Sequence, residues 1–339
     1  FFRDTMAPKA DKGPSAKELK RLAKLKEQAQ KESRALVETG VGFADKGKWQ
    51  QAIQSYTQAI EVDPENTDAY LQRGRAEKEL KEYDKAISDY TQVLELDASE
   101  SSAFSGRGNA YECIGDFDKA IEDYTSVIEL VPDADHAYNM RGNARQARRI
   151  TGLKLKNAEF ASVISDFTKA IEINPHNFYA FNNRGNAYFD RKDFRSAIED
   201  YSQAISIKVD YSYSYLRRGI ACYESVLYDE KLARQKMEEE NDEDKTTKLP
   251  KDPNECKAQW EQEFRAAEEK ELKAKERVQL LTNAIANFKT MLTFDPSDIE
   301  AYQHRCKVFK MLGQEENAKE DERKIMELEI KLAQAKAAS

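Results

Sequence analysis

Small and aromatic residues recur along the chain at a long interval, within segments whose hydrophobic positions follow a helical period. The interval is set by glycines 34 residues apart, with one interval of 43: Gly40, Gly74, Gly108, Gly142, Gly185 and Gly219. Small and then aromatic residues follow at matching positions: Ala52, Ala86, Ala120, Val163, Ala197, Ala284 and Ala318, and Tyr56, Tyr90, Tyr124, Phe167, Tyr201 and Phe288. Small residues let two helices approach closely, and the aromatic side chain fills the space between neighbouring pairs. The pattern therefore predicts helical hairpins stacked in a row.

Proline ends the second helix of several predicted hairpins, because it cannot continue the helical hydrogen-bond pattern. These prolines are Pro64, Pro132, Pro175 and Pro296. Together the landmarks resemble those of the tetratricopeptide repeat family, which has this 34-residue period. The resemblance implies an all-α fold, a right-handed α-solenoid of about seven helical hairpins. We place the repeats at residues 33–66, 67–100, 101–134, 135–177, 178–211, 212–298 and 299–332.

Three parts of the chain depart from the repeat. Residues 1–32 are predicted to form a basic leader helix, because Ser15 and Glu18 make a capping box before a lysine-rich segment. Insertions lie at about 148–157 in the fourth repeat and 223–276 in the sixth, and residues 333–339 extend the last, capping helix. We expect the longer insertion to be a helical hairpin, and a flexible charged loop is the alternative. The leader is either a solvated helix or a contact for an acidic surface such as a filament or RNA.

Composition narrows the classes of function. The net charge of −8 disfavours general nucleic-acid binding, and no apolar run is long enough to span a membrane. Four cysteines without CxxC spacing indicate neither a disulfide framework nor a zinc site, so we expect a reduced, cytoplasmic protein without a metal or cofactor. His136, His176 and His304 are isolated from any nucleophile at motif spacing. We therefore expect no enzyme.

One position before the repeated glycine is usually arginine, and one position before the aromatic residue is usually aspartate. The first repeat has Thr39 and Ser55 there, so both charges are lost together. We therefore predict structural ion pairs between the two positions, and an arginine-lined ligand site is the alternative. The pairs are Arg73 with Asp89, Arg107 with Asp123, Arg141 with Asp166, Arg184 with Asp200, and Arg305 with Asp321, and Asn287 replaces the aspartate opposite Arg218.

The family resemblance also implies a concave groove lined by the first helix of each repeat. Groove positions gather amides, aromatic residues and one arginine: Asn109, Asn139, Asn143, Tyr179, Asn182, Asn183, Asn186, Tyr213 and Arg217. Amides both donate and accept hydrogen bonds, so a row of them can hold a peptide backbone or a carboxylate. The alternative is a solvated polar helix face.

Co-chaperones of this family hold the C-terminal carboxylate of heat-shock chaperones with two lysines, two asparagines and one arginine. In repeats four to six those places hold Asn139, Asn143, Asn183, Tyr213 and Arg217, so three of five match and both lysines are missing. In repeats one to three none matches. Loss of two ammonium groups removes most of the attraction for an acidic tail.

The sequence therefore favours an interaction scaffold or adaptor. We expect a subunit of a larger cytoplasmic or cytoskeletal assembly, a ciliary one included, that binds a partner segment in the concave groove. The N-terminal helix and the insertion of the sixth repeat are further expected contacts for protein partners. A co-chaperone with a degenerate carboxylate clamp is the alternative, and the oligomeric state stays open.

Overall fold

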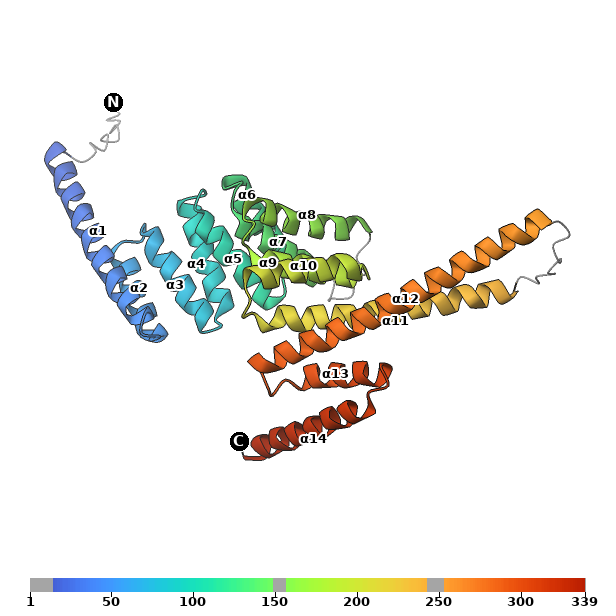
Figure 1. The fold of residues 1–339 in the computed structure, drawn as a ribbon. Helices are drawn as coiled ribbons and strands as arrows, with labels where there is room; N and C mark the ends of the chain where they lie inside the picture. The colour runs from blue at the N-terminus through green and yellow to red at the C-terminus, as the bar shows by residue number, and fades with distance from the viewer. Residues whose placement is uncertain (1–14, 149–156, 243–252, 339) are drawn as a thin grey trace, which may run out of the picture. The chain divides into compact units, whose positions relative to one another are not determined.

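The chain folds into helices that are joined by short turns wherever the connection is described (Figure 1). The computed structural model describes residues 15–148, 157–242 and 253–338, and no strand occurs among them. The chain divides into two compact units, an N-terminal unit (Phe1–Thr151) and a C-terminal unit (Gly152–Ser339). The predicted all-α fold of consecutive helical hairpins is confirmed.

In the N-terminal unit, each helix packs against the one that follows it (Figure 1). The first helices of successive hairpins also contact one another, α1 with α3 and α3 with α5, which places them along one side of this unit. The helices are α1 (Ala16–Ala44), α2 (Trp49–Val62), α3 (Thr67–Glu79), α4 (Tyr83–Leu96), α5 (Ser101–Ile114), α6 (Phe117–Leu130) and α7 (Asp135–Arg148).

The C-terminal unit has the same internal arrangement, in which α11 contacts both α9 and α13 as neighbouring first helices. Its helices are α8 (Asn157–Ile173), α9 (Phe178–Asp190), α10 (Phe194–Ile207), α11 (Ser212–Asp242), α12 (Pro253–Phe294), α13 (Ile299–Met311) and α14 (Glu315–Ala338). The fourth predicted repeat contributes α7 to one unit and α8 to the other. Most of its insertion, residues 149–156, lies outside the described residues.

The repeated glycine is a packing requirement at the crossing of the two helices. A Cβ atom added to Gly185 would lie 2.8 Å from Cε1 of the Tyr201 ring, closer than carbon atoms can pack. Tyr201 is fully buried, and Ala197, one turn earlier on α10, is buried too. The small residues therefore bring the helices together, and the aromatic ring fills the space that remains.

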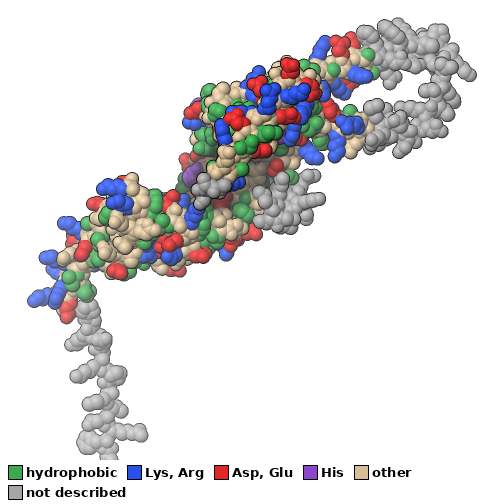
Figure 2. Space-filling view, turned by 90° about the horizontal axis from the view of Figure 1, so that it is seen from below, with side chains coloured by type: hydrophobic (Ala, Val, Ile, Leu, Met, Phe, Trp, Pro, Cys, Tyr) green, Lys and Arg blue, Asp and Glu red, His purple; other side chains and the backbone are tan. Residues whose placement is uncertain are grey.

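The leader begins at its predicted cap but is not separate from the first repeat. Ser15 Oγ accepts a hydrogen bond from the Glu18 backbone at 3.4 Å, and the Glu18 carboxylate accepts one from the Ser15 backbone at 2.7 Å. Helix α1 then runs without interruption past residue 32, where we placed the boundary. Three leucines on its first turns are 53–56% exposed, namely Leu19, Leu22 and Leu25. Basic side chains gather at this end of the N-terminal unit (Figure 2).

The insertion of the sixth repeat lengthens α11 and α12 into a long helical hairpin, as predicted (Figure 1). At its base, Val226 and Leu281 belong to the core of the C-terminal unit, and Arg277 Nε lies 2.8 Å from the Glu230 carboxylate. Further out, Leu232 and Leu272 are exposed. Residues 243–252 lie outside the described part of the chain. No helix of the described segments combines the length and apolar character needed to cross a membrane.

Candidate functional site

Arginines of the first helices are held by aspartates of the second helices. Arg184 donates from Nε and Nη2 to the two oxygens of Asp200, both at 2.8 Å, and both side chains are largely buried. This two-point geometry is the strongest form of an arginine–carboxylate pair. The same geometry occurs between Arg73 and Asp89, Arg107 and Asp123, and Arg305 and Asp321. Arg141 and Asp166 belong to different units, and Arg218 donates to the amide oxygen of Asn287.

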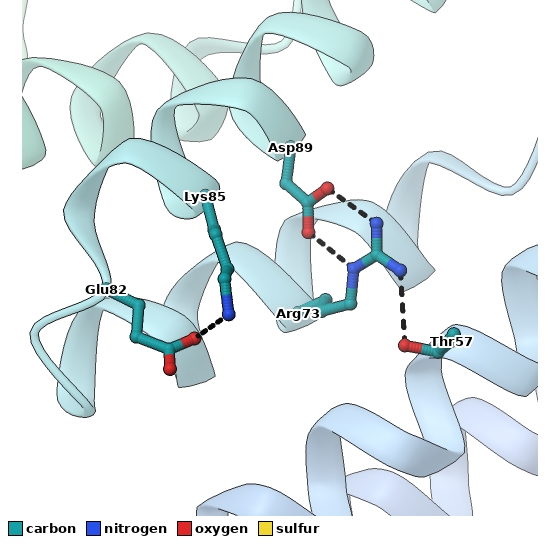
Figure 3. A network of polar contacts seen from close by, with 5 residues as sticks. All are labelled: Thr57, Arg73, Glu82, Lys85 and Asp89. Carbon is teal, nitrogen blue, oxygen red and sulfur yellow. Dashed lines mark hydrogen bonds and ion pairs between the residues drawn. The ribbon is translucent and has the colours of Figure 1, made fainter.

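The third nitrogen of these guanidinium groups reaches the preceding repeat. Arg73 donates from Nη1 to Thr57 Oγ1 at 3.2 Å, while its other two nitrogens bind Asp89 (Figure 3). Equivalent bonds of 3.0–3.2 Å join Arg107 to Thr91, Arg141 to Thr125, Arg184 to Thr168, and Arg218 to Ser202. Both contacts are present at Arg73, Arg107, Arg184 and Arg218, so each of these arginines ties its own hairpin together and links it to the previous one.

This role leaves the arginines little capacity for a ligand. Burial raises the pKa of Asp200, and the Arg184 guanidinium opposes part of that rise. An aromatic ring three residues earlier covers one face of each guanidinium, as Tyr302 does for Arg305 at 5.2 Å. The geometry therefore supports structural pairs rather than an arginine-lined site. Sequence reasoning missed the hydroxyl partner, although a threonine or serine directly follows the repeated aromatic residue in the first five repeats.

The predicted groove residues are divided between the units and differ in accessibility. Asn109, Asn139 and Asn143 lie in the N-terminal unit, and the other six lie in the C-terminal unit. Asn139 is buried in α7. Asn182 is only 2% exposed; it donates to the Phe178 carbonyl at 2.9 Å and accepts from Ser214 Oγ at 2.8 Å. Neither amide is open to a partner, so we remove both from the candidate surface.

Asn186 is the centre of a hydrogen-bonded cluster with Tyr201, Tyr213 and Arg217, which we call the Asn186 cluster. Its amide oxygen accepts from the Tyr201 hydroxyl at 2.8 Å and from Arg217 Nε at 3.0 Å. Its amide nitrogen donates to the Tyr213 hydroxyl at 3.0 Å. The Arg217 guanidinium also lies over the Phe189 ring, 4.7 Å from its centroid. The cluster fixes α9 against α11, and it uses hydrogen-bonding capacity that we had assigned to a partner.

Four aromatic rings gather beside this cluster at the start of α9 and of α11. Phe178 lies 4.0 Å from Tyr179 and 5.1 Å from Tyr211, and Tyr211 lies 5.9 Å from Tyr213, measured between ring centroids. Tyr179 is 54% exposed and Tyr213 is 37% exposed. We call Phe178, Tyr179, Tyr211 and Tyr213 the aromatic patch. The sequence pointed to Tyr179 and Tyr213 but not to the two rings that complete it.

Sequence profiles of known families match the chain within the repeats that the structure shows. A profile described as TPR repeat matches residues 42–80, and profiles described as tetratricopeptide repeat match residues 67–100, 103–138 and 178–211. The chain belongs to the tetratricopeptide repeat family. No curated protein matches it in sequence.

The chain is also similar to solved structures, and one tetratricopeptide repeat protein among them shares its fold over most of its length. A tetratricopeptide repeat protein from Parabacteroides merdae is 16% identical, with a TM-score of 0.55 over 88% of this chain and 93% of that one. The first TPR of Spaghetti (RPAP3), bound to the HSP90 peptide SRMEEVD, is 31% identical, with a TM-score of 0.34 over 35% of this chain and 94% of that one. MamA from Desulfovibrio magneticus RS-1 is 16% identical, with a TM-score of 0.47 over 53% of this chain and 97% of that one.

Within this tetratricopeptide repeat protein, the places of a chaperone-tail clamp are occupied by groups with other roles. The two lysine places hold the buried Asn139 and the clustered Tyr213. The arginine place holds Arg217, whose Nε is already bound to Asn186. An incoming carboxylate would have to compete for this guanidinium without the help of an ammonium group.

The described residues include two buried or partly buried side chains with shifted pKa values but no candidate metal site. No group of three or more His, Cys, Asp or Glu side chains among them is placed to hold a metal ion. His304 stacks against Phe288 in the C-terminal unit, and burial lowers its pKa below the usual value. Cys222 is buried, which raises the pKa of its thiol to about 11.

Proposed function

We propose that this tetratricopeptide repeat protein is a non-enzymatic interaction scaffold that binds a partner segment on the first-helix surface of its C-terminal unit. The observation that carries the proposal is the aromatic patch. Exposed aromatic rings that contact one another are expensive to leave in water, and such residues are enriched at the energetic centres of protein interfaces. Asn186 donates a hydrogen bond to the Tyr213 hydroxyl and itself accepts one from Arg217, so the Asn186 cluster restrains the Tyr213 side chain.

Two further elements favour a fixed place in an assembly over transient peptide capture. The start of α1 carries exposed leucines among lysines, and the arms of the α11–α12 hairpin extend beyond the core of the C-terminal unit. A simple peptide receptor needs neither. We propose a larger cytoplasmic or cytoskeletal complex, with ciliary complexes included, as the setting, and these elements as additional protein contacts.

The experiment compares two double variants in cells that make the native complex. Tyr179→Ala with Tyr213→Ala removes the exposed rings of the patch, and we expect retention of the native partner to fall at least about tenfold. Met326→Ala with Ile330→Ala removes exposed apolar surface from α14 and should change retention less than about twofold. Thermal unfolding of both variants establishes that they are folded. Full retention by the tyrosine variant would refute the proposal.

The alternative function is a co-chaperone that binds acidic chaperone tails. It is favoured by Asn143, Asn183 and Arg217, which stand at three of the five clamp places. Because both ammonium groups are missing and Arg217 is already bound, we predict a dissociation constant of roughly 100 μM or above for an acidic C-terminal tail peptide. Calorimetric titration measures it. Low-micromolar binding that is abolished by Asn183→Ala with Arg217→Ala would establish the adaptor instead.

A further inference from the structure

A pocket of about 390 Å³ opens on the first helices of the N-terminal unit, between α3, α5 and the start of α7. It exists because small residues occupy the exposed side of α5, where Ser101, Ser102, Ser105 and Gly106 line it. The position of Gly106 holds Arg217 in the sixth repeat and His304 in the seventh, both with large side chains. We call this cavity the Gly106 pocket.

The floor of the Gly106 pocket is a tyrosine with an unused hydroxyl. Tyr90 is 1% exposed, and its Cζ atom, which carries the hydroxyl, would lie 2.6 Å from a Cβ atom added to Gly106. The equivalent hydroxyls of Tyr124 and Tyr201 donate to Glu112 and Asn186, but the Tyr90 hydroxyl has no hydrogen-bond partner among the described residues. Burial raises the pKa of Tyr90 to about 12, so the hydroxyl remains a donor at neutral pH.

Asn109 shows the same difference between the two units. It occupies in the third repeat the position that Asn186 occupies in the fifth. The positions of Tyr213 and Arg217, which bind Asn186, correspond in the fourth repeat to His136 and Met140. The Asn109 amide forms no hydrogen bond within the described part of the chain. The site that is closed by its own side chains in the C-terminal unit is therefore open in the N-terminal unit.

The charge of the pocket is positive in a chain whose net charge is −8. Arg75 and Lys78 of α3 line one side and His136 of α7 lines the other. No Asp or Glu occurs among the described residues that line it, and Lys78 has no ion-pair partner among them. The pocket thus combines two cations with hydroxyl and amide donors, and Val127 and Val131 form an apolar wall beside them.

We propose that the Gly106 pocket binds the phosphate group of a phosphorylated serine or threonine in a partner protein. A phosphate monoester carries about two negative charges and three acceptor oxygens, which match the cations and the surplus of donors here. A carboxylate offers two oxygens and one charge, and would leave several of these donors without a partner. This site belongs to the N-terminal unit and the aromatic patch to the C-terminal unit, and the site goes beyond the function proposed above.

The test uses the full-length chain and three immobilised heptapeptide libraries that differ only in the fixed central residue: phosphoserine, serine or glutamate. We expect the protein to bind the phosphoserine library at least about tenfold more tightly than either of the others. Because the chain has three histidines, the imidazole NMR signals can be assigned by substitution. Binding should shift the signal of His136 and leave that of the exposed His176 in place.

Variants separate a pocket from general charge attraction. Lys78→Ala, and independently Asn109→Leu, should weaken phosphoserine binding about tenfold, whereas Lys46→Ala, an exposed lysine outside the pocket, should change it less than twofold. Equal binding to the phosphoserine and serine libraries, or equal loss in Lys46→Ala and Lys78→Ala, would overturn the proposal. Equal binding to glutamate would overturn the assignment to phosphate. None of these outcomes depends on the aromatic patch, so the two proposals fail separately.

Discussion

At the residue scale, the repeated arginine explains how a recurring sequence position stabilises the packing of the hairpins. Its guanidinium is planar and offers donors in fixed directions, so one side chain can bind a carboxylate at two points and a hydroxyl at a third. In the seventh repeat Arg305 keeps the carboxylate, but Lys289 stands at the place of the hydroxyl, and an ammonium group cannot accept a hydrogen bond. The pair within a hairpin and the link to the previous one are therefore separable.

A double-mutant cycle tests the pair in the fifth repeat. We predict that Arg184→Ala or Asp200→Ala lowers the free energy of unfolding by about 1–3 kcal/mol, because each leaves a buried charge without its partner. The double variant should lower the free energy of unfolding by much less than the sum of the two single losses. Urea denaturation measures all four proteins. Additive losses would show that the two side chains do not act as a pair.

We expect the effect of Glu77 on the free energy of unfolding to depend on pH. It is 6% exposed, its Oε2 atom has no hydrogen-bond partner, and burial, with the neighbouring Asp89 carboxylate, raises its pKa from 4.5 to about 7. The folded chain therefore favours protonated Glu77, and this stabilisation is lost as pH rises from about 4.5 through 7. We predict that Glu77→Gln raises the free energy of unfolding by about 1–3 kcal/mol at pH 8 and changes it little at pH 4. An equal gain at both pH values would contradict the shifted pKa.

The roles of some of these residues were predictable from the sequence, and those of others were not. The pairing of arginine with aspartate was predictable, because Thr39 and Ser55 show both charges lost together in one repeat. The burial of Asn182 was not, because it depends on Ser214, which the next repeat places against it. The Gly106 pocket was not predictable either, because it depends on small side chains on α5 and on a Tyr90 hydroxyl that lacks the partner found by its equivalents Tyr124 and Tyr201.

At the scale of elements, the spacing of small and aromatic residues predicted the hairpins well because packing alone sets that spacing. It did not predict how far the helices extend. Helix α1 includes both the leader and the first helix of the first repeat. Residues that favour helix continue across residue 32, and no helix-breaking residue interrupts them. The same reasoning explains the long arms of α11 and α12, whose Glu, Lys, Arg and Ala content favours helix with little core contact.

The outer arms of the α11–α12 hairpin should be dispensable for folding. We predict that replacing residues 231–273 with a short glycine linker keeps unfolding cooperative and the melting temperature within a few degrees, because Val226, Leu281 and the Glu230–Arg277 pair remain. Retention of the native complex should fall. Scanning calorimetry and copurification measure the two effects. A broad or absent transition would show that the arms stabilise the core.

At the scale of the whole molecule, each unit has a candidate binding surface on its first helices. The two surfaces differ in the side chains that they expose. In the C-terminal unit the polar groups satisfy one another and leave aromatic rings exposed. In the N-terminal unit the polar groups stay open around a cavity. A protein that holds several partners needs such distinct surfaces, and the repeat fold supplies them without changing its core.

Site-specific photo-crosslinking tests the central claim, that first-helix surfaces hold the partner, most directly. A benzophenone amino acid is placed at Tyr213 in the aromatic patch or at Gln203, which is exposed on the second helix α10. The native complex is then irradiated, and the crosslinked partner is identified by mass spectrometry. We predict a crosslink to a single partner from position 213 and none from position 203. Crosslinking from position 203 without crosslinking from position 213 would contradict the account.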